Sequence, residues 1–243
     1  MSLFPKLLYA HRGACLKLPE NTLEAFEVGL IDGANALELD VHKTRDGVIV
    51  VIHDPDGKRV AGVDQEIKEL TYEQISGWKL KVPTFRQVLE KFKNVPVNVD
   101  IKDHDPGTVR AVVQLVMDLD QSEWVRLTGE SKAVTKLIKQ FKYPGLIGMG
   151  MGDIAALKLL PKWMIGRKFA GRAAQVPMRY FIFNFATARF VRKCHELGVR
   201  VDYWVVNDLK SAHALAEIGA DGIMSDDPGS VKDWLKEGPK LSA

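Results

Sequence analysis

The chain has 243 residues and a net charge of +3 at pH 7, and 46% of its residues are hydrophobic. This length and composition suit a globular protein with one sizeable core, because α/β barrels of about 250 residues commonly form a single unit. No apolar run approaches the roughly 20 residues that cross a bilayer. The small net charge and the lack of a recognisable binding motif argue against a nucleic-acid partner.

Short β-like runs alternate with helical patterns along the chain. Strands are expected at residues 7–10, 36–41, 48–53, 96–101, 125–128, 145–149, 174–177, 200–205 and 222–225. Helices are expected from residue 21 to about residue 30 and at 84–93, 108–119, 131–141, 187–197 and 209–218. Asn21 and Glu24 have the spacing of a capping box, with Asn21 as the N-cap. Gly198 and Gly219 each follow a helix, where glycine commonly ends it.

This regular alternation of strands and helices predicts a parallel sheet. About eight strand–helix units in this length predict a (β/α)₈ TIM barrel of the α/β class. No GxGxxG motif follows the first strand, so the marker of a dinucleotide-binding fold is missing. Residues 55–82, rich in charged residues and glycine, interrupt the alternation and are interpreted as an insertion over one end of the barrel. No linker or repeat divides residues 1–243, which are expected to form a single domain.

The two cysteines, Cys15 and Cys194, lie far apart and form no CxxC pattern. They predict neither a disulfide framework nor a zinc site, as is typical of a reducing compartment. The first residues contain a single lysine and a short apolar patch rather than a secretory signal. A cytoplasmic protein is therefore expected.

Carboxylates gather where predicted strands end. Glu38 and Asp40 share one face of a strand because successive side chains alternate, and Asp100 shares a face with Lys102 for the same reason. In a parallel barrel, the carboxyl ends of the strands form the rim where catalytic groups collect. Three carboxylates brought together there repel one another unless a cation neutralises them, and oxygen ligands suit Mg²⁺ or Ca²⁺.

Two histidines end strands on the same rim, His11 after the first strand and His53 after the third. They are suited to general acid and general base roles near neutral pH. Arg12 and Lys102 add positive charge for an anionic substrate, and an arginine can donate two hydrogen bonds to phosphate oxygens. The set as a whole predicts metal-assisted cleavage of a phosphodiester.

Each of these residues has a structural alternative when it is taken singly. His53 could be a structural histidine at a strand end, and Asp40 or Asp100 could cap a helix or hold a loop. Glu38 is harder to explain in this way, because a glutamate within an apolar strand is costly to bury without a partner. The coincidence of the whole set favours a functional site.

The chain resembles the glycerophosphodiester phosphodiesterase family over nearly its whole length. The matching segments are HRG at 11–13, PENT at 19–22, ELD at 38–40, TRDGVIVVIHD at 44–54, NVDIK at 98–102, YWVVND at 203–208 and DGIMSDDP at 221–228. The resemblance implies a (β/α)₈ barrel with a small insertion after the second barrel unit, in agreement with residues 55–82. It also implies hydrolysis of glycerophosphodiesters to glycerol 3-phosphate and an alcohol.

By position, the resemblance implies roles for eight residues. They are the general acid/base pair His11 and His53, the ligands Glu38, Asp40 and Asp100 of Mg²⁺ or Ca²⁺, and the substrate contacts Arg12, Lys102 and Trp204. Trp204 is expected at the pocket wall, with a place in the barrel core as the alternative.

Two positions depart from the family pattern. Asp100 stands where the family usually has glutamate, and its side chain is one methylene shorter, so the metal is expected to shift, to bind through a water or to be a different ion. Thr128 and Gly129 follow the strand after which a Ser-Phe-like pair is expected, and this loop is predicted to influence the choice of alcohol.

The segment between Asp153 and Glu196 contains no acidic residue and nine basic ones, so the rest of the chain carries about −6. Such asymmetry indicates an anionic partner. Residues 158–172 mix apolar and basic side chains, as in elements that lie on anionic membranes, although a barrel helix and a loop with solvated charges are the favoured interpretation. Weak membrane contact here would suit an alternative function, a phospholipase D-like enzyme acting on lysophospholipids. A non-catalytic phosphodiester-binding protein is a further alternative, against which both histidines argue.

Overall fold

A computed structural model describes residues 4–165, 169 and 171–238 of the chain. Its main sheet contains the parallel strands β1 (Leu7–His11), β2 (Ala36–Lys43), β6 (Val97–Ile101), β7 (Val125–Thr128), β8 (Leu146–Ile147), β9 (Ala173–Val176), β12 (Arg200–Tyr203) and β13 (Gly222–Ser225). They are hydrogen-bonded in the order β8-β7-β6-β2-β1-β13-β12-β9. A parallel bridge between Gly148 and Ala173 joins β8 to β9 and nearly closes the sheet into a barrel.

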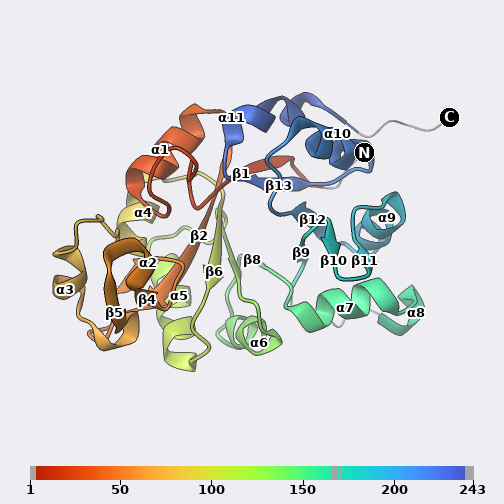
Figure 1. The fold of residues 1–243 in the computed structure, drawn as a ribbon. Coiled ribbons are helices and arrows are strands. Elements are labelled where there is room, and N and C mark those ends of the chain that lie inside the picture. The colour runs from red at the N-terminus through yellow and green to blue at the C-terminus, as the bar shows by residue number, and fades with distance from the viewer. Residues whose placement is uncertain (1–3, 166–168, 170, 239–243) are drawn as a thin grey trace.

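A helix follows each barrel strand and packs outside the sheet (Figure 1). These helices are α1 (Leu23–Ile31), α4 (Phe85–Lys91), α5 (Pro106–Asp118), α6 (Lys132–Gln140), α7 (Met151–Leu159), α9 (Ala188–Glu196), α10 (Leu209–Glu217) and α11 (Pro228–Val231). The predicted (β/α)₈ barrel is thereby confirmed. In the part of the chain that the structure describes, no helix is both long and apolar enough to span a membrane.

The barrel has an apolar outer layer and a partly polar interior. Leu37, Leu39 and Val41 of β2 belong to the main core with residues of the surrounding helices. Inside the barrel, the carboxylate of Asp202 is fully buried and pairs with the guanidinium groups of Arg126 and Arg200. The two arginines outweigh the effect of burial and hold the pKa of Asp202 below its usual value.

The insertion follows the second barrel strand and has a small core of its own. It comprises β4 (Asp56–Gly57), α2 (Lys58–Ala61), β5 (Val63–Glu66), the 3-10 helix η1 (Ile67–Glu69) and α3 (Tyr72–Ser76). Ile67, Ile75 and Trp78 form this core with Val50 and Ile52. The strand predicted at 48–53 is shorter, β3 (Ile49–Val51), and it pairs antiparallel with β2, so it supports the insertion instead of entering the barrel.

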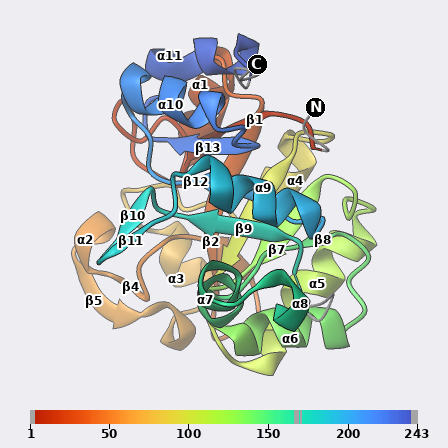
Figure 2. The same ribbon diagram turned by 90° about the vertical axis from the view of Figure 1, so that its right-hand side faces the viewer.

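A second excursion lies between β9 and α9. It is a short antiparallel hairpin of β10 (Arg179–Tyr180) and β11 (Phe183–Asn184). Figure 2 shows this hairpin projecting at the same end of the barrel as the insertion. Between α7 and β9 the structure also describes a short helix, α8 (Lys162–Ile165). Arg167 and Lys168, two of the basic residues in segment 158–172, lie outside the described residues.

The predicted N-cap of α1 is wrong. Thr22 caps this helix, since its hydroxyl accepts a hydrogen bond from the backbone N–H of Ala25 at 3.2 Å. Asn21 instead adopts a left-handed conformation with φ of 58° and turns its amide toward Asp40. Asparagine and threonine are both good caps, so the motif alone does not decide which of two neighbours takes the role. The glycines after α9 and α10 are confirmed, with φ of 68° at Gly198 and 83° at Gly219.

Candidate active site

The register of three adjacent strands brings the predicted site residues together. His11 at the end of β1 lies beside Glu38 of β2, and Asp40 lies beside Asp100 of β6. Because the strands are parallel, these side chains reach the same rim of the barrel.

The turn after β1 depends on two consecutive left-handed residues, Arg12 with φ of 56° and Gly13 with φ of 86°. A Cβ atom at Gly13 would approach the carbonyl carbon of Ala25 to 2.6 Å, so only glycine fits there. The backbone N–H of Arg12 contacts the Glu38 carbonyl oxygen at 3.0 Å and its carboxylate at 3.3 Å. The guanidinium of Arg12 lies against Asp40, with Nε 3.2 Å from Oδ2.

Asp40 is a buried carboxylate with three polar side-chain partners. It is 2% exposed, and its Oδ1 lies 2.9 Å from Nζ of Lys102. Asn21 donates to its Oδ2 at 3.1 Å. Burial opposes the ionisation of Asp40, but Lys102 and Arg12 outweigh it and keep the pKa of this carboxyl below its usual value. Asp40 is therefore ionised at neutral pH.

Glu38 has the opposite electrostatic situation. The residue is 5% exposed, and burial together with the nearby charge of Asp40 raises its pKa to about 7. The pKa of Glu38 is raised first by burial and then by the charge of Asp40, and His11 and Lys102 only partly offset these effects. A divalent cation would compensate the remaining negative charge, so the oxygen donors of Glu38 and Asp40 fit a hard metal ion.

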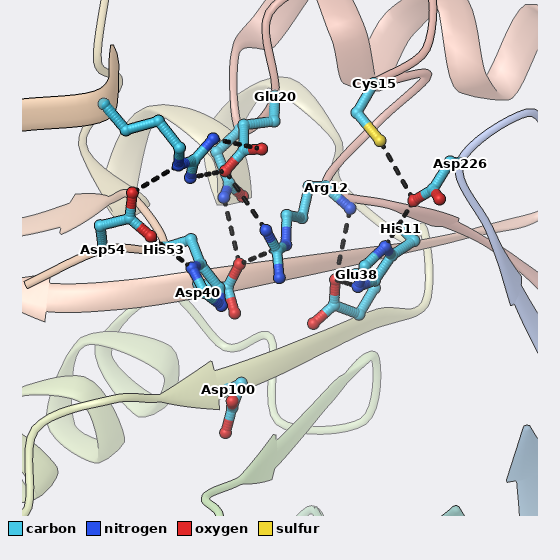
Figure 3. Close-up of polar contacts among 12 residues, drawn as sticks. His11, Arg12, Cys15, Glu20, Glu38, Asp40, His53, Asp54, Asp100 and Asp226 are labelled. Atoms are coloured by element: carbon cyan, nitrogen blue, oxygen red, sulfur yellow. Dashed lines mark hydrogen bonds and ion pairs between the residues drawn. The ribbon is translucent and has the colours of Figure 1, made fainter. Parts of the chain in front are cut away.

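Lys102 bridges Asp100 and Asp40. The ammonium group of Lys102 contacts both Asp40 and Asp100, at 2.9 Å and 2.7 Å. In Figure 3, Asp100 stands on its own strand, apart from Glu38 and Asp40. The shorter third carboxylate therefore reaches Lys102 rather than the other two carboxylates.

His11 is oriented by an aspartate that sequence reasoning did not assign. Its Nδ1 lies 2.7 Å from Oδ1 of Asp226, and its Nε2 lies 3.8 Å from Glu38 (Figure 3). Burial lowers the pKa of His11, but Asp226 and Glu38 outweigh this effect and raise it. Although burial disfavours a charged Asp226, hydrogen bonds from His11, Asn207 and Cys15 hold its pKa at about 2. Asp226 is thus an anion that fixes the histidine ring.

Ligand atoms of His11, Cys15 and Asp226 also lie within 4.8 Å of one another. Among the described residues, these three are the histidine, cysteine and acidic side chains that lie close enough together to hold a metal ion. The ligand atoms of the three predicted carboxylates lie farther apart. The group is held by hydrogen bonds, with Cys15 donating to Asp226 at 3.2 Å. Burial and Asp226 raise the pKa of Cys15 to about 12, so its thiol is protonated and a poor ligand at neutral pH.

His53 has a similar carboxylate partner, supplied by its neighbour in the chain. Its Nδ1 lies 2.7 Å from Oδ1 of Asp54, whose Oδ2 accepts from Nε of Arg59 at 2.6 Å. Arg59 belongs to α2 of the insertion and also binds Glu20, at 2.7 Å and 3.0 Å. Glu20 in turn contacts Arg12 at 3.4 Å. The insertion is therefore tied to both sides of the site.

A buried histidine supports the backbone at His53. His42 lies on β2, and its Nδ1 is 2.7 Å from Oδ1 of Asp103. Its Nε2 lies 3.2 Å from the carbonyl oxygen of His53. This contact holds the backbone at His53, two residues beyond the end of β3. The sequence predicted that the strand would continue to this residue.

All eight predicted site residues line one cavity of about 390 Å³. Trp204 forms part of its wall with 39% of the residue exposed, so its alternative place in the barrel core is wrong. Thr128 and Gly129 line it as well. Apolar residues that no sequence motif predicted complete the wall, and they include Met149, Met151, Ile154, Pro177, Tyr180 and Val205.

A (β/α)₈ barrel with two carboxylate-paired histidines and buried carboxylates at the carboxyl ends of its strands has the groups that a barrel hydrolase needs for general acid and general base catalysis. The Glycerophosphoryl diester phosphodiesterase family matches residues 11–230 of the chain. The chain therefore belongs to this family, and the expected enzyme class, a phosphodiesterase, is confirmed.

Two relatives of known sequence are similar to this chain over nearly its full length. A glycerophosphodiester phosphodiesterase of Caldanaerobacter subterraneus is 28% identical, covering 96% of this chain and 98% of that protein. A lysophospholipase D of Homo sapiens is 26% identical, covering 94% of this chain and 84% of that protein.

Solved structures share the fold. The glycerophosphodiester phosphodiesterase of Thermotoga maritima has a TM-score of 0.77 and 24% identity, covering 92% of this chain and 96% of that one. A phosphodiesterase of Oleispira antarctica, solved with the product sn-glycerol-3-phosphate, has a TM-score of 0.76 and 17% identity, covering 96% of this chain and 98% of that one.

Proposed function

We propose that the protein hydrolyses glycerophosphodiesters to glycerol 3-phosphate and an alcohol. The observation that carries this proposal is the convergence of His11 and His53, each with its own carboxylate partner, on one cavity with Glu38 and Asp40. Membership of the family supports the reaction, and the solved relative with sn-glycerol-3-phosphate supports the product.

Glu38 and Asp40 would hold a divalent ion, Mg²⁺ or Ca²⁺, and Asp100 would complete the site from β6, directly or through a water. The fit rests on oxygen donors and on the raised pKa of Glu38. When bound, the ion supplies positive charge that neutralises the phosphodiester. Arg12 and Lys102 add to that charge from the same wall and orient the phosphate.

The two histidines divide the proton transfers. A carboxylate can only accept, so Asp226 and Asp54 hold the neutral rings of His11 and His53 with the proton on Nδ1. The Nε2 atom of each ring is then left for proton transfer. One histidine takes a proton from the nucleophile, which is either water or the 2-hydroxyl group of the glycerol. The other histidine gives a proton to the leaving alkoxide.

The test is the release of glycerol 3-phosphate from glycerophosphocholine with Mg²⁺ or Ca²⁺ present. His11→Ala and His53→Ala are each expected to lower kcat by about 10²–10⁴-fold, the usual contribution of a general acid or base. His213→Ala is the matched control, because His213 lies on α10 with its side chain 53% exposed. Release at nearly the wild-type rate by either site variant would contradict the acid–base role proposed for that histidine.

A second candidate reaction is the hydrolysis of lysophospholipids by the same machinery. The apolar part of the cavity wall favours it, since Met151, Tyr180 and Val205 would contact an acyl chain better than a small polar alcohol. The relative named lysophospholipase D supports this candidate. Comparing glycerophosphocholine with its long-chain monoacyl derivative separates the two substrates.

A further inference from the structure

The tip of the β10–β11 hairpin exposes large apolar side chains to solvent. Phe181 is 87% exposed and Ile182 is 90% exposed, and they form the two-residue turn between Tyr180 and Phe183. The ring of Phe181 meets the half-exposed ring of Tyr180 edge-on, with centroids 4.7 Å apart. The three side chains, Tyr180, Phe181 and Ile182, are called the hairpin tip below.

Folding of the chain alone does not favour these residues at the hairpin tip. Phe181 has a left-handed backbone with φ of 50°, a conformation that two-residue hairpin turns normally give to glycine or asparagine. Its exposed ring also removes little apolar surface from water. Both the backbone and the hydrophobic effect therefore disfavour phenylalanine here, which points to a contact outside the chain.

Hydrogen bonds and core packing anchor the two strands of the hairpin. The carbonyl oxygen of Met178 accepts hydrogen bonds from the backbone N–H groups of Phe185 and Ala186, at 2.9 Å and 3.2 Å. Phe183 packs against the main core, and the buried ring of Phe185 packs edge-on against that of Phe190, with centroids 5.3 Å apart. The tip thus projects from an anchored element.

The hairpin tip continues the wall of the active-site cavity. Tyr180 lines that cavity, as do Met151, Trp204 and Val205, each of which is 39–40% exposed. Figure 2 shows the hairpin at the end of the barrel that also carries the insertion. An apolar surface therefore extends from the cavity mouth to the tip, while charged side chains line the cavity floor.

Two basic side chains lie on or beside the strands of the hairpin. Arg179 precedes it on β10, and the ammonium group of Lys158 contacts the carbonyl oxygen of Asn184 on β11. The sequence has no acidic residue between Asp153 and Glu196. Exposed aromatic and aliphatic side chains flanked by basic ones match the chemistry of an anionic lipid surface.

We propose that the hairpin tip docks on an anionic lipid surface and guides monoacyl glycerophospholipids from that surface into the active-site cavity. The proposal rests on the proposed phosphodiesterase function and narrows its substrate class. The acyl chain lies along Tyr180 and Trp204, and the phosphodiester reaches the two histidines and Lys102 at the cavity floor. Arg179 and Lys158 attract the anionic head groups beside the tip.

The basic segment 158–172 offers a matched comparison. On α8, Trp163 is 83% exposed and Met164 is 51% exposed, so this helix also presents apolar side chains. In Figure 2, α8 lies away from the hairpin tip, so docking through it would not bring the cavity mouth to the lipid. Loss of apolar side chains from α8 should therefore leave lipid hydrolysis intact.

The experiment compares wild type with Phe181→Asn/Ile182→Ser and with Trp163→Ser/Met164→Ser. Asparagine suits the left-handed position, so the hairpin variant is expected to fold at least as well, as thermal unfolding would check. Flotation uses phosphatidylcholine vesicles with and without phosphatidylglycerol. Activity is measured on glycerophosphocholine and on a long-chain monoacyl glycerophosphocholine above its micelle concentration.

The hairpin variant should bind phosphatidylglycerol vesicles at least about tenfold more weakly and lose a similar factor in activity on the micellar substrate. Its activity on glycerophosphocholine should be unchanged, and the α8 variant should behave like wild type. Equal vesicle binding and equal activity on the micellar substrate in the hairpin variant and wild type would overturn the proposal. A loss of vesicle binding and micellar activity in the α8 variant alone would also overturn it. Tip-dependent vesicle binding by a wild type that hydrolyses neither substrate would refute the proposed function and the lipid delivery, and would leave only the docking.

Discussion

Replacing Asp226 with asparagine should disable His11 without changing the size of any side chain. Asn207 is locked in place, because its Oδ1 accepts hydrogen bonds from the Asp226 backbone N–H at 2.9 Å and from Ser225 at 3.0 Å. Its Nδ2 must therefore point at Oδ2 of residue 226, 2.8 Å away. In Asp226→Asn, the new amide has to turn its oxygen toward Asn207 and its NH₂ toward His11.

That orientation reverses the hydrogen bond at His11. The Nδ1 atom must accept from the new NH₂ group, so the neutral ring carries its proton on Nε2 instead. A histidine held in the wrong tautomer loses about 10⁴-fold in kcat where an aspartate–histidine pair has been tested in this way. A loss of about 10²–10⁴-fold is expected here, because the ring of His11 also lies near Glu38.

The assay is the release of glycerol 3-phosphate from glycerophosphocholine at saturating divalent ion, with thermal unfolding as the check on folding. Nitrogen NMR of His11 should show the proton moving from Nδ1 to Nε2. Asp227→Asn is the matched control, since Asp227 is the next residue and contacts Lys17 rather than a histidine. An Asp226→Asn variant whose kcat stays within about threefold of wild type would refute the reasoning.

Three further predictions follow from other contacts. Asp100→Glu should bind Mg²⁺ or Ca²⁺ roughly tenfold more tightly by calorimetry, because the longer carboxylate reaches further into the cavity, and unchanged affinity would remove Asp100 from the metal site. Asp202→Ala should lower the free energy of unfolding in urea by about 3–5 kcal/mol, because it leaves the buried guanidinium groups of Arg126 and Arg200 without their shared carboxylate. Arg59 helps to hold the pKa of Asp54 at about 2, below its usual 3.8, which stabilises the fold above pH 4 and is lost as the pH falls toward 2. Arg59→Gln should therefore be less stable than wild type at pH 6 by thermal unfolding, and a difference that does not shrink by pH 2 would contradict the assignment.

The sequence predicted the barrel and the strand-borne part of the site because both follow from simple periodicity. Alternation along one strand places Glu38 and Asp40 on the same face, and parallel pairing sets Asp40 beside Asp100. The roles given to these residues, and to the two histidines, stay predictions until variants are assayed.

What the sequence could not predict depends on contacts between distant segments. Asp226 reaches His11 across 215 positions, and the only signal for it was the SDDP segment, which was recognised without a role. Arg59 lies in an insertion whose composition is typical of a loop. Its contacts with Asp54 and Glu20 form only when the chain folds. The hairpin at 179–184 was missed because its strands are two residues long, too short for periodicity to reveal.

The central claim is that this cavity hydrolyses glycerophosphodiesters with the help of a divalent ion. The most direct measurement is the release of glycerol 3-phosphate from glycerophosphocholine by the purified protein, with Mg²⁺ or Ca²⁺ added and then removed by a chelator. The account predicts release that depends on the ion and is restored when the ion is returned. No release with either ion, or release that persists unchanged after chelation, would contradict it.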